Sequence, residues 1–398
     1  MTSFFSKLSV AVRKPFVKII QKPNPVLYLG AGKVQKVGAL LAGCAVNKVL
    51  VLTDHFLHTS GLLAPVFESL QATGVSYIVF DAVRPDPTFD VVNEACKAYA
   101  DCEAIIAVGG GSVMDTAKAV GASVANKKPA IRMAGLLKVK KSLPFLIAVP
   151  TTAGTGSETT VAAVISDPKT HVKKQILSPK IVPQVAILDP TLTTGLPPAP
   201  TAYTALDALT HALEAYTAGY ADVQTDRYAT SAIKLIYENV NAALQSPKDL
   251  AVREALQEAA FYAGMAFTRT YVGYVHAFAH TIGGRFGVPH GLATAVLLPH
   301  VMQFYQDTCK SRFAELADLL GICDKMDPQT AKAEKLVQSL FALNESLQVP
   351  QYFEKFPKEE IESVITAAFH ECHGVYPVPK YYTRQQAREL MQKVCVQE

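Results

Sequence analysis

The chain has no tryptophan, no CxxC pair among its seven cysteines, and no apolar run long enough to cross a bilayer. Scattered cysteines in an odd number exclude a complete disulfide framework and indicate free thiols in a reducing compartment, so we expect a cytoplasmic protein. Surplus charge is also small. A formal net charge of +4, without a concentrated basic patch interleaved with aromatic residues, argues against a nucleic-acid partner.

Core-forming residues, by contrast, are abundant. Of the 398 residues, 49% are hydrophobic and 18% are charged, a globular composition with enough length for two domains. Residues 1–25 differ from the rest because they hold five basic residues and no acidic one. Such a stretch can be a targeting peptide or a membrane-surface helix. It lacks a clean apolar segment and a small-residue cleavage site, so we favour a surface extension that packs on the protein body or on a neighbour.

The first half of the chain alternates short apolar segments with amphipathic ones. The apolar segments predict buried strands, and the amphipathic stretches 89–100 and 113–124 predict helices between them. This alternation indicates a doubly wound parallel sheet in an α/β, Rossmann-like domain over residues 26–195. The predicted strands are 48–53, 76–80, 104–108, 145–149 and 185–188.

After the proline-rich segment 195–200 the strand-like runs nearly vanish. Long amphipathic patterns take their place, so residues 196–398 should form an almost wholly helical domain. The predicted helices are 203–218, 226–244, 251–268, 311–320, 328–347 and 358–370.

A glycine-rich turn follows the predicted strand 104–108 and opens the next helix. Gly109, Gly110 and Gly111 let a backbone approach a bound group closely, and the free N–H groups of a helix N-terminus suit a phosphate. The alternative is that Ser112 and Asp115 form only a capping box on an ordinary helix. We favour a phosphate site, with which a capping box is compatible.

Two further segments suit a dinucleotide. Asp54 follows the predicted strand 48–53, where a carboxylate can bind ribose hydroxyls and repel a 2′-phosphate, which favours NAD over NADP. Capping of the next helix explains Asp54 equally well. The segment 149–158, which includes Thr151 and Thr152, offers hydroxyls and backbone N–H groups to a pyrophosphate or a nicotinamide amide. A plain surface turn is the alternative for this segment.

Five polar residues in apolar surroundings give the strongest chemical signal. Asp207 and His211 are spaced i,i+4, as are His276 and His280, so each pair shares one face of a helix. A glycine-containing turn leads from there to His290. A carboxylate with several imidazoles suits a divalent transition metal such as iron(II) or zinc.

Spacing alone does not decide which four of the five bind. His280 is compatible with three roles: a metal ligand, a residue that hydrogen-bonds to a ligand, or an acid/base. The alternative for the whole set is that these residues are polar core residues and helix caps without a metal. The run 370–373, with two histidines, is a much weaker metal candidate, because isolated short clusters rarely complete a site.

These motifs resemble the iron-containing (group III) alcohol dehydrogenases, the family of lactaldehyde reductases and propanediol dehydrogenases. The resemblance runs from about residue 25 to the C-terminus. It rests on GGGSVMD at 109–115, PTTAGTGSE at 150–158, DALTHALEAY at 207–216 and HAFAH…GVPHGLA at 276–293. It implies a dinucleotide-binding domain, an all-helical metal domain and an active site in the cleft between them.

The resemblance also implies roles for single residues. The implied metal ligands are Asp207, His211, His276 and His290, with His280 as the catalytic residue beside the nicotinamide and substrate. The implied NAD contacts are Asp54, Gly109, Gly110, Ser112, Asp115, Thr151, Thr152, Thr160, Lys173 and Leu192, the last two with a looser match. A homodimer or larger homo-oligomer is expected on the same ground.

The chain departs from the family pattern at Thr281, where proline is common, and at Thr294, where asparagine is common. From the sequence, these departures bear on the substrate rather than on the metal or the cofactor.

The implied activity is NAD-dependent interconversion of a primary alcohol and its aldehyde, with iron(II), or alternatively zinc, as Lewis acid and His280 for proton transfer. A hydroxyacid–oxoacid transhydrogenase is one alternative, because it would keep the same groups. A glycerol-dehydrogenase-like polyol oxidoreductase is another, against which the HxxxH-x9-H spacing argues. A non-catalytic nucleotide-binding scaffold would need no metal ligands.

Overall fold

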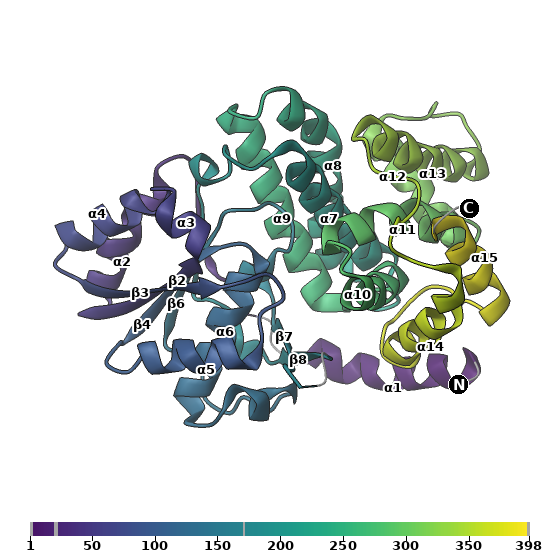
Figure 1. The fold of residues 1–398 in the computed structure, drawn as a ribbon. Coiled ribbons are helices and arrows are strands. Elements are labelled where there is room, and N and C mark those ends of the chain that lie inside the picture. Colours follow the sequence, from purple (N-terminus) through teal and green to yellow (C-terminus); the bar gives the residue numbers. More distant parts are fainter. Residues whose placement is uncertain (1–2, 20–22, 170–171, 396–398) are drawn as a thin grey trace. The chain divides into compact units, whose positions relative to one another are not determined.

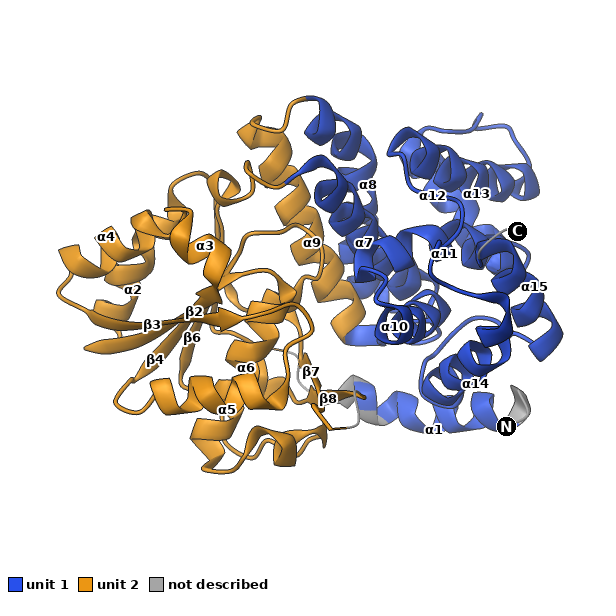
Figure 2. Ribbon diagram, in the orientation of Figure 1, with its two compact units in different colours: residues 1–20, 197–245, 269–398 blue, residues 21–196, 246–268 orange. Residues whose placement is uncertain are grey.

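The computed structural model describes residues 3–19, 23–169 and 172–395, and Figure 1 shows its helices and strands. The chain forms two compact units, which Figure 2 distinguishes by colour. The α/β unit comprises residues 21–196 and 246–268. The helical unit comprises residues 1–20, 197–245 and 269–398.

A six-stranded parallel sheet forms the centre of the α/β unit. Its strands, in spatial order, are β1 (Val26–Leu29), β9 (Val185–Leu188), β6 (Phe145–Pro150), β4 (Ala104–Gly109), β2 (Lys48–Asp54) and β3 (Ser76–Val83). Successive side chains of a strand point to opposite faces, so Leu50 and Leu52 join one core cluster while Val49 and Val51 join the other. The predicted α/β fold is confirmed, and β1 is an additional strand.

Helices cover both faces of this sheet, as a doubly wound fold requires. On one face, α5 (Phe89–Ala98) and α6 (Gly111–Asn126) contribute to the core cluster. On the other face, α2 (Val37–Gly43) and α4 (Ala64–Ala72) do so. The short helix α3 (His55–Thr59) follows β2 directly.

A second, three-stranded sheet belongs to the same unit, and no strand-like pattern predicts it. β5 (Gly135–Leu136) pairs in parallel with β8 (Lys173–Leu177), and β8 pairs antiparallel with β7 (Ala162–Ser166). The reason is local: β5 is only two residues long, and the sequence of β8, KKQIL, has little apolar alternation.

Helix α9 (Leu250–Thr270) packs across the predicted domain boundary. Sequence position places 251–268 in the helical domain, whereas residues 246–268 pack with the α/β unit. Gly264 allows a close approach to the loop after β6: a Cβ there would lie 2.6 Å from Gly156 O. Gln257 Nε2 also donates a hydrogen bond to Pro150 O at 3.1 Å. Periodicity identifies a helix but not the unit on which it packs, so the ranges 26–195 and 196–398 do not coincide with the compact units.

The helical unit contains no strand among its described residues. In it, α7 contacts α8 and α11, α10 contacts α11 and α14, and α12 contacts α13. Its helices after α1 are α7 (Pro198–Thr217), α8 (Val223–Gln245), α10 (Tyr274–Phe286), α11 (His290–Tyr305), α12 (Lys310–Leu320), α13 (Gln329–Ser346), α14 (Ile361–Cys372) and α15 (Arg384–Val394). Every residue of α7 from Ala205 to Thr217 is buried, so its polar side chains need partners.

The basic extension forms α1 (Ser3–Ile19), which is hydrogen-bonded to the rest of the helical unit. Ser9 Oγ donates to Gly374 O at 2.8 Å, and Tyr220 Oη donates to Val10 O at 2.7 Å. Of the other residues of the extension, 23–25 are described, whereas 1–2 and 20–22 lie outside the described residues. No described helix combines the length and apolarity needed to cross a membrane.

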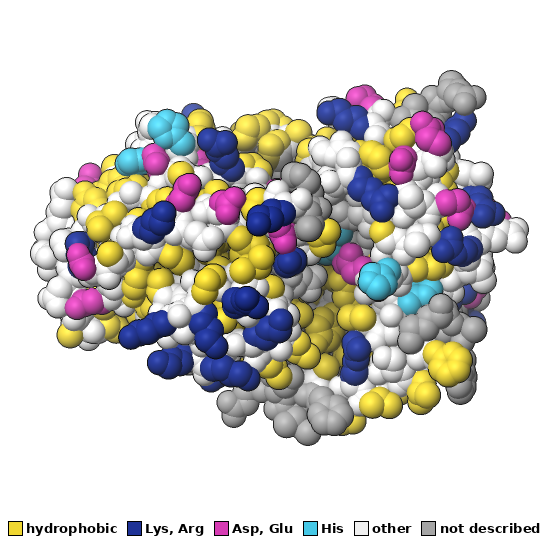
Figure 3. Space-filling model, turned by 60° about the horizontal axis from the view of Figure 1, so that its bottom comes forward, with side chains coloured by type: hydrophobic (Ala, Val, Ile, Leu, Met, Phe, Trp, Pro, Cys, Tyr) yellow, Lys and Arg dark blue, Asp and Glu magenta, His cyan; other side chains and the backbone are white. Residues whose placement is uncertain are grey.

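One segment of the α/β unit exposes several positively charged side chains close together in the sequence. Between residues 127 and 141 there is no acidic residue. The exposed cations of this segment are Lys127, Lys128, Arg132, Lys138, Lys140 and Lys141. Figure 3 shows Lys and Arg side chains gathered on the face in view. The exposed apolar residues of this segment, Ile131, Leu136 and Leu137, are aliphatic, so the aromatic stacking typical of nucleic-acid binding has no basis here.

Candidate metal centre and cofactor loops

The helical unit brings the predicted metal ligands together from three helices. α7 carries Asp207 and His211, α10 carries His276, and His290 is the first residue of α11. Gly287, with a left-handed φ of 67°, ends α10 and turns the chain toward α11. Both i,i+4 pairs therefore lie on helices, and the glycine turn is where the sequence predicts it.

Three of the four predicted ligands converge on one point. Asp207 Oδ1 lies 3.4 Å from His290 Nε2 and 3.6 Å from His276 Nε2, and one ligand atom of each residue lies within 4.8 Å of the others. His211 is adjacent but outside this three-atom group. Its ring stacks on that of His276 with centroids 4.4 Å apart, and its Nδ1 is 4.0 Å from Asp207 Oδ2.

Burial makes this group unfavourable unless a cation completes it. Asp207 is only 2% exposed and His276 only 1%, and His276 Nε2 has no hydrogen-bond partner among the described residues. Polar atoms in that state carry a large desolvation cost. A carboxylate oxygen with imidazole nitrogens is a donor set that iron(II) and zinc both accept. The residues present therefore fit a divalent transition metal.

The charges of the group point the same way. Burial raises the pKa of Asp207, but His211 and His290 outweigh it, so the net shift is downward and the carboxylate is ionised. Burial lowers the pKa of His211 to about 3, which leaves the neutral imidazole that binds metals. Burial also lowers the pKa of His276, but Glu214 and Asp207 outweigh it and raise the pKa to about 9. These carboxylates stabilise positive charge at His276, which a metal ion can supply in place of a proton.

Glu214 holds His276 in place, although the sequence motifs assign it no role. Its Oε2 accepts hydrogen bonds from His276 Nδ1 at 2.7 Å and from Gly273 N at 2.6 Å, while its Oε1 accepts from Val275 N at 2.7 Å. Because Glu214 Oε2 accepts this hydrogen bond, Nδ1 carries a proton, and Nε2 is the ring nitrogen that can offer its lone pair to a metal in place of a second proton. A signal existed in the sequence: Glu214 follows Asp207 by seven residues, two turns along the same helix face.

Thr294 contacts the same centre. Its Oγ1 donates to Asp207 Oδ1 at 3.2 Å, and the residue is fully buried on α11. The sequence pattern connects this departure with the substrate, but the structure places the hydroxyl on a predicted metal-ligand carboxylate. The contact with a predicted metal ligand is one that the sequence pattern does not indicate, and the bearing of Thr294 on the substrate stays a prediction.

His280 lies one turn after His276 on α10 but outside the three-atom group. Its ring meets that of His276 edge-on, with an interplanar angle of 65° and centroids 5.7 Å apart, and it stacks on that of His290 at 5.3 Å. Its Nδ1 is 2.7 Å from Glu371 Oε1, so a second carboxylate holds this ring. Like His211, His280 therefore lies next to the three-atom group without being part of it.

The weak metal candidate at 370–373 is not a cluster. Glu371 faces His280, whereas His373 Nε2 is hydrogen-bonded to Tyr274 Oη at 2.5 Å. Across the described ranges, the Asp207 group is the only set of three or more such side chains close enough to share a metal ion.

In the α/β unit, the predicted glycine turn joins β4 to α6. Gly109 ends β4, Gly110 precedes the first turn of α6, and Ser112 lies in that turn. A Cβ on Gly111 would lie 2.7 Å from Thr155 Cγ2, so the close approach of two loops requires glycine here. No described side chain caps the N-terminus of α6, and its first N–H groups are therefore available to a phosphate.

Asp115 and Thr160, both predicted NAD contacts, join these loops to each other. Asp115 forms no capping box; it accepts hydrogen bonds from Ser157 Oγ at 2.7 Å and Val164 N at 2.9 Å. Lys118, one turn later and fully buried, donates to Ser157 Oγ at 2.9 Å and Thr160 Oγ1 at 2.8 Å. Burial lowers the pKa of Lys118 to about 8. Lys118 thus fixes the shape of the second loop, a role that the motifs do not indicate.

Three other predicted NAD contacts lie at strand ends. Thr151 N donates to Gly109 O at 3.0 Å, which joins the loops after β6 and β4, and the adjacent Thr152 is half-buried. Asp54 ends β2, and its Oδ1 accepts a hydrogen bond from Leu57 N at 2.9 Å. The capping explanation of Asp54 is confirmed, which leaves ribose binding a prediction for its other oxygen.

The two looser matches differ in accessibility. Lys173 lies on β8, and its Nζ donates to Asp86 Oδ1 at 2.6 Å. Leu192 follows β9 in a 3₁₀ turn (Pro190–Leu192) and is only 4% exposed, because its side chain packs in the core of the sheet. A contact from Leu192 to a cofactor would have to come from its backbone.

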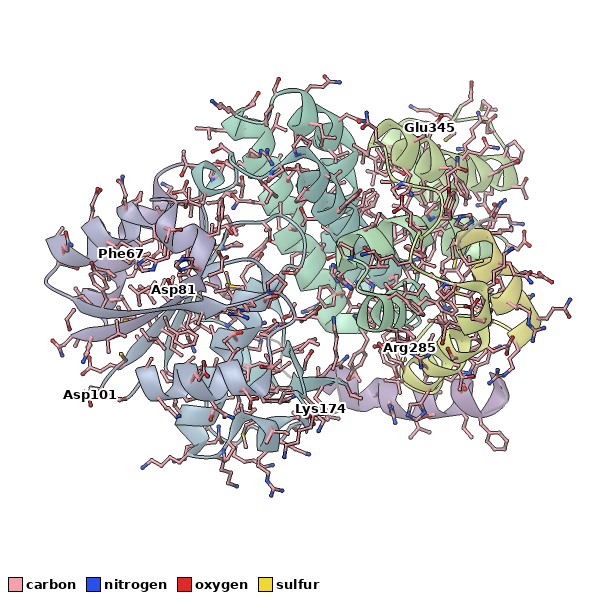
Figure 4. All side chains as sticks on the ribbon, viewed as in Figure 1. Phe67, Asp81, Asp101, Lys174, Arg285 and Glu345 are labelled. Atoms are coloured by element: carbon pink, nitrogen blue, oxygen red, sulfur yellow. The ribbon has the colours of Figure 1, made fainter. Side chains whose placement is uncertain are left out.

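Two histidines after Asp54 share one carboxylate. His55 Nδ1 and His58 Nδ1 lie 3.0 and 2.8 Å from Asp81 Oδ2 on β3, and Asp81 is labelled in Figure 4. The hydrogen bonds from His58 and His55 lower the pKa of Asp81. This exposed pair orders the surface next to the end of β2.

Known proteins share both halves of this arrangement. The sequence model "Iron-containing alcohol dehydrogenase" matches residues 24–190, and "Fe-containing alcohol dehydrogenase family, C-terminal" matches residues 201–395. The NAD-dependent methanol dehydrogenase of Bacillus methanolicus is 38% identical over 351 residues, which cover 87% of this chain and 92% of that relative. The lactaldehyde reductase of Escherichia coli is 34% identical over 362 residues, with coverage of 89% and 94%.

A solved structure shares the fold as well. The crystal structure of a 1,3-propanediol oxidoreductase matches with a TM-score of 0.91 at 32% identity, over 94% of this chain and 99% of that one. Such agreement covers the nucleotide loops and the metal-centre helices together. The chain belongs to the iron-containing alcohol dehydrogenase family.

Proposed function

We propose that Asp207, His211, His276 and His290 hold the iron of this enzyme and that His280 exchanges the proton of its reaction. As a family member, the protein is an NAD-dependent oxidoreductase that interconverts an alcohol and its aldehyde. The observation that carries the residue assignment is the convergence of Asp207, His276 and His290 around a buried nitrogen, His276 Nε2, that has no described hydrogen-bond partner.

Bound iron(II) supplies Lewis acidity toward the alcohol oxygen, and NAD accepts or returns the hydride. The side chains of this protein perform the remaining tasks. Glu214 keeps the Nε2 lone pair of His276 available by holding its Nδ1 proton. His280 accepts the alcohol proton during oxidation and returns it during reduction.

For the cofactor, we propose that the glycine turn at the start of α6 binds the pyrophosphate and Asp54 binds the adenosine ribose. The uncapped N-terminus of α6 supports the first assignment, and the position of Asp54 at the end of β2 supports the second. The other assigned NAD contacts are Ser112, Asp115, Thr151, Thr152, Thr160, Lys173 and Leu192. Of these, Asp115 and Thr160 act at least partly by shaping the loops.

A small or hydroxylated primary alcohol is the proposed substrate. The named relatives act, by their names, on methanol, 1,3-propanediol or lactaldehyde. We further propose a homodimer or larger homo-oligomer in the cytoplasm. None of the seven cysteines, all of which lie in the described residues, forms a disulfide, which agrees with a reducing compartment. Sedimentation velocity would measure the assembly.

The function is tested with metal-free protein reconstituted with iron(II) or zinc. A panel of primary alcohols with NAD+ and NADP+, and the matching aldehydes with NADH and NADPH, should give iron-dependent turnover with the non-phosphorylated cofactor. Full activity after thorough chelation would contradict the metal role. Hydride transfer from a hydroxy acid to an oxo acid without net release of NADH would instead identify a transhydrogenase.

A further inference from the structure

His280 is held by a carboxylate from a distant part of the chain. It lies on α10, and its Nδ1 is 2.7 Å from Oε1 of Glu371 on α14, a helix that packs against α10. The ring also contacts two neighbouring imidazoles: it stacks on His290 and meets His276 edge-on at an interplanar angle of 65°. These contacts leave Nδ1 of His280 facing Glu371.

Glu371 is itself fixed by a second donor. Tyr376, in the segment after α14, donates its hydroxyl to the same Oε1 at 2.6 Å and is only 4% exposed. Burial raises the pKa of Glu371, but His280 and Tyr376 outweigh it, so the net shift is downward. Glu371 is therefore an ionised acceptor with a defined position.

An ionised carboxylate has no proton to donate, so the hydrogen bond assigns the proton to Nδ1 of His280. The neutral ring then has its lone pair on Nε2. A similar relation exists at His276, whose Nδ1 faces Glu214. The two rings differ in one respect: His276 contributes a nitrogen to the three-atom metal group, and His280 does not.

We propose that Glu371, held by Tyr376, is a positioning residue that keeps His280 in the tautomer whose Nε2 exchanges the substrate proton. The inference rests on the proposed function, in which His280 is the proton-transfer residue. A carboxylate behind an imidazole performs this orienting task in other enzymes, where it stays ionised throughout.

The proton and the hydride balance as follows. In oxidation, the alcohol O–H bond breaks and its proton passes to His280 Nε2. The C–H bond next to the oxygen breaks, and its hydrogen leaves with both electrons to NAD+, which gives NADH and the aldehyde. The imidazolium then releases the Nε2 proton to water. Glu371 neither gains nor loses a proton.

The experiment compares Glu371→Ala, Glu371→Gln and Tyr376→Phe with a matched control. Glu362→Gln is that control, because Glu362 lies on the same helix and makes only exposed ion pairs with Arg384 and Arg388. We expect Glu371→Ala to lower kcat by about 10- to 100-fold with little change in KM or iron content. Glu371→Gln and Tyr376→Phe should lower kcat less, because each retains part of the contact, and Glu362→Gln should not change it.

A second measurement does not depend on activity. In zinc-loaded protein with nitrogen-15-labelled histidine, the His280 signals are assigned by their absence in His280→Gln. The wild type should show the neutral Nδ1–H form of His280, and Glu371→Ala should shift the ring toward the Nε2–H form. Tyr376→Phe keeps this test available if Glu371→Ala does not fold.

The outcomes separate the two proposals. Unchanged kcat and an unchanged tautomer in Glu371→Ala would overturn the positioning role while leaving the dehydrogenase reaction intact. Loss of kcat with an unchanged tautomer would also overturn it. If the loaded wild type did not reduce NAD+ with any alcohol, the proposed function would fail, although the tautomer measurement would still report on Glu371.

Discussion

Two glutamates hold two histidines of the same helix in the same way. Glu214 and Glu371 each face the Nδ1 atom of a histidine on α10, and both contacts are 2.7 Å long. The Nε2 atom of His276 then lies 3.6 Å from Asp207, whereas His280 lies outside that group. In the proposed function, these orientations leave His276 to bind the metal and His280 to exchange the proton.

The first prediction concerns Glu214. Replacing it with glutamine should weaken iron binding by about 10- to 100-fold, because the amide holds the Nδ1 proton of His276 less strongly. Competition with a chelator measures the affinity. Glu238→Gln, at an exposed position on α8, is the control. An affinity equal to that of the wild type would show that Glu214 does not support the metal centre.

A second prediction concerns pH and the buried Glu158. Burial raises the pKa of Glu158 to about 7, above its unfolded value. The folded state then binds more protons than the unfolded state from about pH 4.5 to 7, so stability falls as the pH rises through that window. Glu158→Gln removes this loss, which is on the order of 2–3 kcal/mol.

Denaturant unfolding at pH 5 and at pH 7.5 measures this effect. Relative to the wild type, Glu158→Gln should gain stability at the higher pH. A difference between the two proteins that does not vary with pH would show that Glu158 has an ordinary pKa.

Residue types and spacing predict the candidate metal ligands but not the residues that hold the site residues in place by hydrogen bonds. Asp207 and His276 each belong to an i,i+4 pair that a helix brings to one face, and this local rule needs no tertiary structure. Glu371 and Lys118 hold partners that are far away in the sequence, and no spacing rule reaches them. The burial of the Leu192 side chain in the core is likewise visible only in the fold, and its contact with NAD stays a prediction.

At the scale of elements, the buried strands are the part that sequence predicts best. β4 and β6 are continuous apolar runs, and their alternating side chains enter both cores. β8 escapes prediction because its sequence, KKQIL, lacks that signal, whereas β7, AAVIS, is a short apolar run that is not among the predicted strands. Helix α9 is predicted as a helix, but only its contacts with the loop after β6 show that it packs with the α/β unit.

The contact between α9 and that loop gives a third prediction. Gly264→Ala places a Cβ 2.6 Å from Gly156 O, so the protein should lose about 1–3 kcal/mol of unfolding free energy. Gly43→Ala, in the same unit, meets nothing within 4 Å and should be close to neutral. Thermal and denaturant unfolding measure both variants. Equal stability of the two would show that α9 can move away from the loop.

At the scale of the whole molecule, the two halves of the chemistry belong to different units. All predicted metal ligands lie in the helical unit, and all predicted NAD contacts lie in the α/β unit. Each half can therefore be measured without the other.

The fourth prediction follows from this division. His276→Ala should lose iron yet bind NADH as the wild type does. Gly111→Val should weaken NADH binding at least about 10-fold, because a side chain there meets Thr155, yet it should retain iron. Metal analysis and NADH fluorescence titration check both variants. Loss of both ligands in either variant would contradict the independence of the two centres.

The path of the chain also has a consequence for its synthesis. The α/β unit is completed by residues 246–268, which follow more than forty residues of the helical unit. A nascent chain that has reached residue 196 has its sheet but not the helix that packs on the loop after β6. Asp207 and His211 therefore leave the ribosome before the nucleotide-binding half is whole, and a single cut of the gene near residue 196 would not yield two self-sufficient proteins.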